Sequence, residues 1–189
     1  MSEFFIKIGG IDDASRKQAC FRYLCDLGMK EHLGWMCAAP NIDELSSLNL
    51  SSVMLFLDHV ARLDGFDGSA CAAGRSRFEH LPWYLDSIWL PVAFRDPKVP
   101  LVEDNGFPVF LGSCQRLIEN LEQIRVLSPL EMGYTPDGYD LMRQDMRAFC
   151  RSGIRLVDKA IIIQWVWKAL HDGARLALQH DAPMLGDGC

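Results

Sequence analysis

The hydrophobic residues of this chain recur mostly at helical spacing, three and four positions apart. The clearest pattern covers residues 158–180, where nearly every position is apolar except for one narrow stripe. That stripe consists of Gln164, Lys168, Asp172, Arg175 and Gln179. A helix that is apolar around most of its circumference is surrounded by other elements. The pattern therefore predicts a long helix over residues 158–180 at the centre of a helical array.

Shorter amphipathic stretches with the same spacing precede this segment. Further helices are predicted over residues 15–27, 31–38, 51–63, 113–127 and 135–153. A separate helical turn is expected to start at Asn41 or Asp43 and to end near Leu48. Ser51 or Ser52 is the expected N-cap of the helix that follows, because a serine hydroxyl can accept a hydrogen bond from a free amide of the first turn.

Strand patterns are scarce. The only candidates are IKIGG at residues 6–10 and FPVFLG at residues 107–112, and an isolated strand pair is marginally stable. Residues 82–94 contain several aromatic residues and prolines, and we expect a helical turn followed by an extended segment there. Residues 65–80 and 95–108 are expected to be loops. The sequence thus predicts a mainly α fold, a single helical domain with few or no strands, built around the C-terminal helix.

Composition narrows the class of protein. The chain has 189 residues, 49% of them hydrophobic and 23% charged, which is typical of one globular domain. No apolar run approaches the length that spans a bilayer, and the first ten residues do not resemble a secretory signal. Seven cysteines, an odd number, then favour a reducing compartment, and we expect a cytoplasmic protein. The net charge of −6 argues against nucleic-acid binding.

Motifs that would identify an enzyme are missing from the sequence. It contains no phosphate-binding glycine loop, no dinucleotide fingerprint, no H-E-x-x-H pair and no calcium loop. His171 and Asp172 form an adjacent pair of the kind that metal-dependent phosphohydrolases use, but the acids that follow lie too close in sequence for a separate helix to supply another ligand. We therefore expect no metal and no cofactor. An unrecognised helical active site would have to draw on Cys114, His59, His80 and His171.

The best binding candidate is the aromatic stretch within residues 82–94. Tryptophan and tyrosine are favoured anchors at protein interfaces, and acidic residues near these rings would give an electronegative rim. The predicted partner-binding residues are Trp83, Tyr84, Asp86, Trp89, Asp96, Glu103 and Asp104. The alternative is that the rings fill the core where the chain crosses over itself.

Three segments give the chain a resemblance to a class of known proteins: DSIWLPVAF at 86–94, FPVFLGSCQRLIENL at 107–121 and AIIIQWVWKALHDGARLA at 160–177. With its acidic balance and its cysteines, the chain resembles the cytosolic immunity proteins that bacteria keep against their own delivered toxins. The resemblance implies a protein that binds a cognate toxin and blocks its active site or its substrate entry, with an acidic side that complements a basic toxin domain. From the net charge and the lack of a long apolar run, we expect no nucleic-acid and no membrane partner. A helical enzyme with a Cys/His site and a homo-oligomeric regulatory scaffold remain the alternatives.

Overall fold

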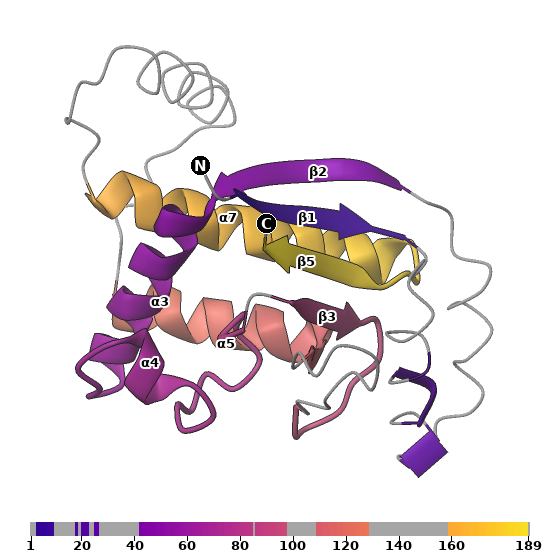
Figure 1. Ribbon diagram of the computed structural model, residues 1–189, viewed down its shortest axis with the longest axis horizontal. Helices are drawn as coiled ribbons and strands as arrows, with labels where there is room; N and C mark the ends of the chain where they lie inside the picture. Colours follow the sequence, from indigo (N-terminus) through magenta and orange to yellow (C-terminus); the bar gives the residue numbers. More distant parts are fainter. Residues whose placement is uncertain are drawn as a thin grey trace.

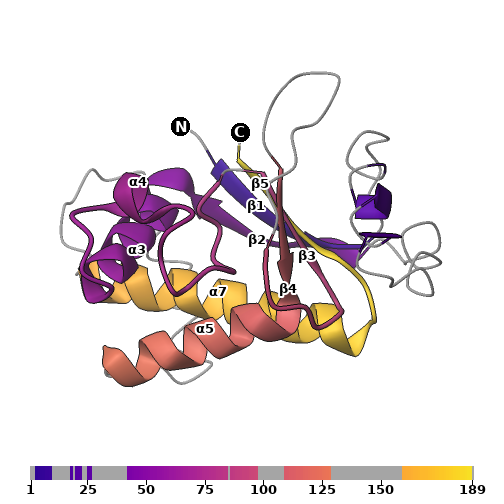
Figure 2. The same cartoon turned by 90° about the horizontal axis from the view of Figure 1, so that it is seen from below.

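The computed structural model describes residues 3–9, 18, 20–22, 25–26, 42–84, 86–97, 109–128 and 159–188. Over these residues the protein is a mixed α/β structure in which helices pack against a five-stranded sheet (Figure 1, Figure 2). The prediction of a mainly α fold with few or no strands is therefore wrong. The elements are, in chain order, β1 (Glu3–Ile8), β2 (Ile42–Asn49), α3 (Leu50–Leu63), α4 (Ser69–Ala72), β3 (Ser87–Leu90), β4 (Phe110–Ser113), α5 (Cys114–Leu127), α7 (Lys159–Gln179) and β5 (Met184–Gly188).

The sheet joins the two ends of the chain. Its strand order is β2-β1-β5-β3-β4, so the last strand lies between the first strand and β3. β3 and β4 run parallel, and the other neighbouring pairs are antiparallel. In Figure 1 the N- and C-terminal ends accordingly lie close together at one end of the sheet. Because β5 fills the centre of the sheet, the sheet is complete only when both ends of the chain have paired.

The strands were only partly predicted. β1 and β4 overlap the two stretches that the sequence indicated, at residues 6–10 and 107–112, and β3 lies within the stretch 82–94 that was expected to end in an extended segment. β2 replaces the helical turn expected to end near Leu48, and β5 was not predicted at all. All four side chains of β3 and of β4 are buried, so these short strands show no alternation of polar and apolar residues.

The helical predictions fared better. α3, α5 and α7 confirm the helices expected over residues 51–63, 113–127 and 158–180 to within two residues at each end. Ser113, the first residue of the helix expected over 113–127, is the N-cap of α5. The expected N-cap of α3, Ser51 or Ser52, is wrong: the N-cap is Asn49, whose Oδ1 accepts a 2.9 Å hydrogen bond from the amide of Ser51.

The other expected helices fall largely outside the described residues. Of the helix predicted over residues 15–27, only residues 18, 20–22 and 25–26 are described, and they are helical. The helices predicted over residues 31–38 and 135–153 lie outside the described part of the chain.

α7 is central, as its pattern predicted, but its neighbours include the sheet. It contacts α3, α5 and strands β1, β2 and β5, and in Figure 2 it runs along the sheet beside α5. Gly173, Ala174 and Ala177 are buried, whereas Asp172 and Arg175 of the polar stripe face solvent. None of the helices in the described residues is long and apolar enough to cross a bilayer.

The sheet separates two hydrophobic clusters. Successive side chains of a strand point to opposite faces, and the core that packs with the helices takes one set of strand residues. That set is Phe4, Ile6, Ile8, Leu48, Trp89, Phe110 and Met184. The alternate set, Ile88, Leu90 and Leu111, belongs to the second cluster. The other members of that cluster are Cys20, Val92 and Phe94 after β3, and Val109 before β4.

Candidate functional site

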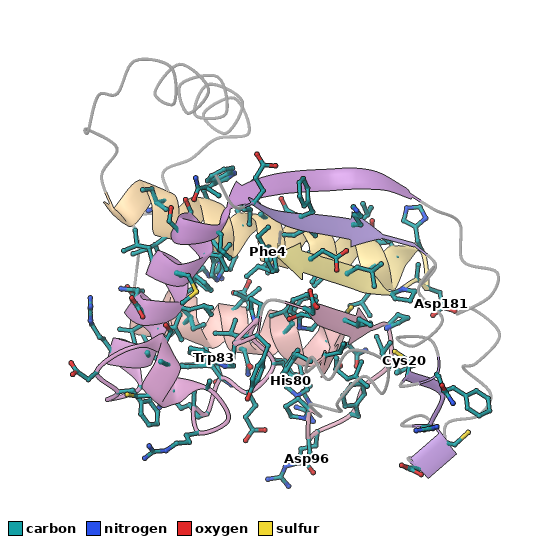
Figure 3. All side chains as sticks on the ribbon, viewed as in Figure 1. Phe4, Cys20, His80, Trp83, Asp96 and Asp181 are labelled. Atoms are coloured by element: carbon teal, nitrogen blue, oxygen red, sulfur yellow. The ribbon has the colours of Figure 1, made fainter. Side chains whose placement is uncertain are left out.

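The predicted partner-binding residues are concentrated in one segment, residues 78–84 and 86–97, which we call the aromatic segment. It leads into β3, crosses the sheet as that strand and leaves it again (Figure 3). Trp89 lies in β3 with 0% of its surface exposed, so it is a core residue. The prediction that Trp89 is a surface anchor is wrong, because its indole belongs to the core that packs with the helices.

Trp83 and Tyr84 are half-buried at the surface. The indole Nε1 of Trp83 donates a 2.9 Å hydrogen bond to the carbonyl of Phe78, and the ring of Tyr84 stacks on Phe110 with the centroids 6.3 Å apart. The hydroxyl of Ser87 donates to the carbonyl of Tyr84 at 2.9 Å. Both rings are thus held in fixed positions while part of each surface faces solvent.

Of the four acidic residues predicted to bind a partner, the structure describes two. Asp96 is exposed and Asp86 is half-buried. Glu103 and Asp104 lie outside the described residues. Glu79, which the sequence analysis did not select, is also exposed and belongs to the same segment.

His80 anchors the aromatic segment to the rest of the protein. Its backbone amide donates to Oδ1 of Asn120 at 3.0 Å, and its carbonyl accepts from Nε1 of Trp89 at 2.7 Å. Its ring lies 2.8 Å, through Nε2, from the carbonyl oxygen of Arg95, and Nδ1 accepts from the amide of Ser113 at 3.0 Å. His80 therefore connects the start of the segment to α5 and β4, and also to the later residues Trp89 and Arg95 of the segment itself.

These contacts assign the tautomer of His80. A carbonyl oxygen can only accept, so Nε2 carries the proton, and an amide can only donate, so Nδ1 is the acceptor. The side chain is 3% exposed. Burial lowers the pKa of His80, and the nearby guanidinium of Arg116 acts in the same direction. The hydrogen bond to Arg95 and the carboxylates of Glu119 and Asp96 oppose the shift without cancelling it.

Cys114, a candidate nucleophile, is closed off from solvent. Its side chain is 0% exposed and its Sγ donates to the carbonyl of Trp89 at 3.4 Å. Burial strongly raises the pKa of the thiol, more than the hydrogen bonds that act on it lower it. Since the thiolate is the reactive form, the position of Cys114 suits a packing residue.

The other candidate catalytic histidines lie on separate helices with partners of their own. Nε2 of His59 lies 3.1 Å from the hydroxyl of Ser128. Nε2 of His171 lies 3.1 Å from a carboxylate oxygen of Glu122, and its ring stacks on Trp167 at 4.6 Å. Each of the four candidates, His80 and Cys114 included, is therefore bound by groups outside the set. Within the described residues no group of three histidine, cysteine or acidic side chains could hold a metal ion.

The hydrogen-bonded cluster around His80 was not predicted from the sequence. Its members come from positions 80, 95, 113 and 120, which are distant in sequence, so no local spacing could indicate their convergence. Comparison of the chain with protein-family models, with curated protein sequences and with solved structures gave no match.

Proposed function

We propose that this protein is a non-enzymatic protein-binding module, and that the aromatic segment is its recognition surface. The observation that carries the proposal is the combination of two partly exposed aromatic rings, Trp83 and Tyr84, with a segment that is held in place through the hydrogen bonds of His80. The partners of His80 are Asn120 and Ser113 outside the segment, and Trp89 and Arg95 within it. Large aromatic side chains supply much of the binding energy at interfaces.

The fixed backbone supports this proposal because binding costs conformational entropy. A loop that must become ordered when it binds loses affinity, whereas a segment already held in place does not. The carbonyl of His80, the carbonyl of Arg95 and the hydroxyl of Ser87 are each engaged in a hydrogen bond that stabilises the segment in its present form. The segment therefore has the properties of a preorganised surface.

The charge of the segment indicates the chemistry of the partner. Glu79, Asp86 and Asp96 contribute carboxylates, against the guanidinium of Arg95, and the whole chain carries a net charge of −6. Complementary charge accelerates encounter and suppresses binding of partners with the wrong sign. We therefore infer a basic protein as the partner. The resemblance to immunity proteins makes a basic toxin domain the partner that we favour, with this chain as its inhibitor.

The experiment combines protection with binding. The products of the genes that flank this one would be expressed singly in a host cell, and any product that arrests growth would be expressed again with this chain. We expect the chain to restore growth and to bind the same product with one-to-one stoichiometry in calorimetry, with a dissociation constant that rises with salt. Failure of every flanking product to bind would overturn the immunity assignment.

Matched charge reversals test the location of the surface. Glu79→Lys combined with Asp96→Lys should weaken binding on the order of tenfold or more, because both carboxylates lie on the aromatic segment. Asp26→Lys combined with Asp67→Lys makes the same change in charge at exposed positions outside the segment. Equal weakening by the two double variants would show that net charge, and not the aromatic segment, governs binding.

A further inference from the structure

We propose that His80 is an acid-sensitive latch: its neutral form holds the aromatic segment against β4, the last strand in the order of the sheet, and its protonation releases the segment. The latch is a property of the fold and does not depend on the function proposed above. It stands on the position of one imidazole between the amide of Ser113 in β4 and the carbonyl of Arg95 after β3.

Ser113 is the last residue of β4, the strand at the end of the sheet order. β4 is the last strand in the order, and its amide at Phe110 faces β3, since it donates to the carbonyl of Asp86 at 2.8 Å. Backbone groups of successive strand residues point in opposite directions, so the amide of Ser113, three positions on, faces away from β3. That outward amide is the one that donates to Nδ1 of His80. The imidazole thus takes the place that the carbonyl of a further strand would occupy.

The other ring nitrogen of His80 contacts the part of the chain that follows β3. Nε2 lies 2.8 Å from the carbonyl oxygen of Arg95, beyond β3 in the chain. The ring therefore bridges the start of α5, through Ser113, and the part of the aromatic segment that follows β3. Only the neutral tautomer with its proton on Nε2 satisfies both contacts.

Protonation of His80 removes its contact with the amide of Ser113 and places a positive charge on a buried side chain. The imidazolium carries N–H groups on both nitrogens, so Nδ1 would confront the amide of Ser113 with a donor. The charge would lie on a side chain that is 3% exposed.

The charged groups around the ring do not reverse this effect. Arg116 and Glu119 approach from α5, and Asp96 approaches from the segment after β3. The burial of the ring outweighs the attraction of the two carboxylates, and the pKa of His80 stays below its ordinary value of 6.5. β3 carries no charged side chain, and its Trp89 donates a hydrogen bond through the indole to the carbonyl of His80.

The direction of the pH effect follows from linkage. The latched form, in which Nδ1 of His80 accepts from Ser113, binds the proton more weakly than an open form in which this contact is broken. The population of the open form relative to the latched form therefore increases as the pH falls through 6.5. The gain grows until the pH reaches the pKa of the latched form. At pH 5 the opening equilibrium can rise by up to about 30-fold over its value at neutral pH, the limit set by an ordinary histidine in the open form.

Amide hydrogen exchange in the full chain tests the latch directly. The probe is the protection factor of the Ser113 amide, normalised to an unstructured amide at the same pH. We expect it to fall between pH 7.5 and pH 5, by at most about 30-fold. The amide of Ala182, which donates to Ala177 at the end of α7, serves as the control and should keep its protection. Constant protection at Ser113, or an equal loss at Ala182, would overturn the proposal.

Two substitutions of His80 remove the titrating ring and distinguish its contact with Ser113 from its contact with Arg95. His80→Asn keeps an acceptor near the position of Nδ1, and His80→Gln keeps a donor near the position of Nε2. We expect neither variant to show the pH-dependent loss at Ser113, and the glutamine variant to lack protection there at every pH. A wild-type loss that persists unchanged in His80→Asn contradicts the latch. If the variants fail to fold, the NMR titration of His80 in the wild type decides, because a midpoint at or above 6.5 also contradicts it.

Discussion

The indole of Trp89 occupies the space beside Gly112 that any other residue would fill with a side chain. The two residues are paired across the parallel strands β3 and β4. A Cβ atom at Gly112 would lie 2.6 Å from Cδ1 of Trp89 and 2.8 Å from Cε1 of Phe110. On the other side of the ring, a Cβ atom at Gly186 of β5 would lie 3.0 Å from Cζ3 of Trp89. The largest fully buried side chain thus fits between two strands that each have a glycine next to it.

Gly112→Ala should therefore destabilise the protein. Neither aromatic ring can move away from the new methyl group without disturbing the core, and overpacking of this kind costs about 1–3 kcal/mol. The free energy of unfolding from urea titration measures the loss. Gly68→Ala is the matched control, because its Cβ would have an ordinary 3.5 Å contact with Asp58 and its backbone is extended. A control as destabilised as Gly112→Ala would show that the tight fit around Trp89 is not the cause.

The same glycines explain why the sheet was hard to predict. β5 reads MLGDG and β4 reads FLGS, and glycine is depleted in strands generally. These strands form because pairing with neighbours and packing of Trp89 compensate for weak local preference, and both are contacts between distant parts of the chain. The helices α3, α5 and α7 were predictable because a spacing of three and four residues is a local signal in each of them.

The candidate site was predictable to the same limited extent. The composition of residues 82–94 indicated a special segment, and Trp83 and Tyr84 do lie at the surface. The sequence could not show that Trp89 faces the core, because β3 is buried on both faces and lacks a periodic pattern. It also could not show that His80 lies between Ser113 and Arg95, since that depends on how the loop folds over the edge of β4.

Trp165→Ala tests the central position of α7. Trp165 is 8% exposed and belongs to the core between the helices and the sheet, and removal of such a side chain costs about 3–5 kcal/mol. Gln179→Ala, at the exposed end of the same helix, should change the free energy of unfolding by no more than about 0.5 kcal/mol. A urea midpoint that barely moves in Trp165→Ala would contradict the central burial of this helix.

Two cysteines should differ sharply in reactivity. Cys71 is exposed on α4, whereas Cys114 is buried and its thiol has a raised pKa because of that burial. With a maleimide at neutral pH, we expect Cys114 to react on the order of 100-fold more slowly than Cys71, as measured by peptide mass spectrometry. In denaturant the two rates should converge. Rapid labelling of native Cys114 would instead support the alternative of a cysteine-based active site.

Asp58 should stabilise the loop after α3 in a pH-dependent way. Its Oδ1 accepts a 2.8 Å hydrogen bond from the amide of Ser69 at the start of α4. Hydrogen bonds from Ser69 lower the pKa of Asp58, and the guanidinium of Arg62 adds to the shift, although burial opposes it. A lowered carboxylate pKa means that the folded state binds the proton less readily. This stability is therefore present above the ordinary value of 3.8 and is lost as the pH falls through the folded-state pKa.

Asp58→Ala should accordingly lower the free energy of unfolding by about 1–2 kcal/mol at pH 6, since a charged hydrogen bond to a backbone amide is lost. The difference from the wild type should shrink as the pH is lowered toward 2.5, because the wild-type carboxylate then becomes protonated. Asp67→Ala, at an exposed acid of the same loop, should show a difference of less than about 0.5 kcal/mol at either pH. Urea titrations at several pH values measure all three proteins. A difference between Asp58→Ala and the wild type that does not change with pH would mean that packing, and not the charged hydrogen bond to Ser69, accounts for the loss.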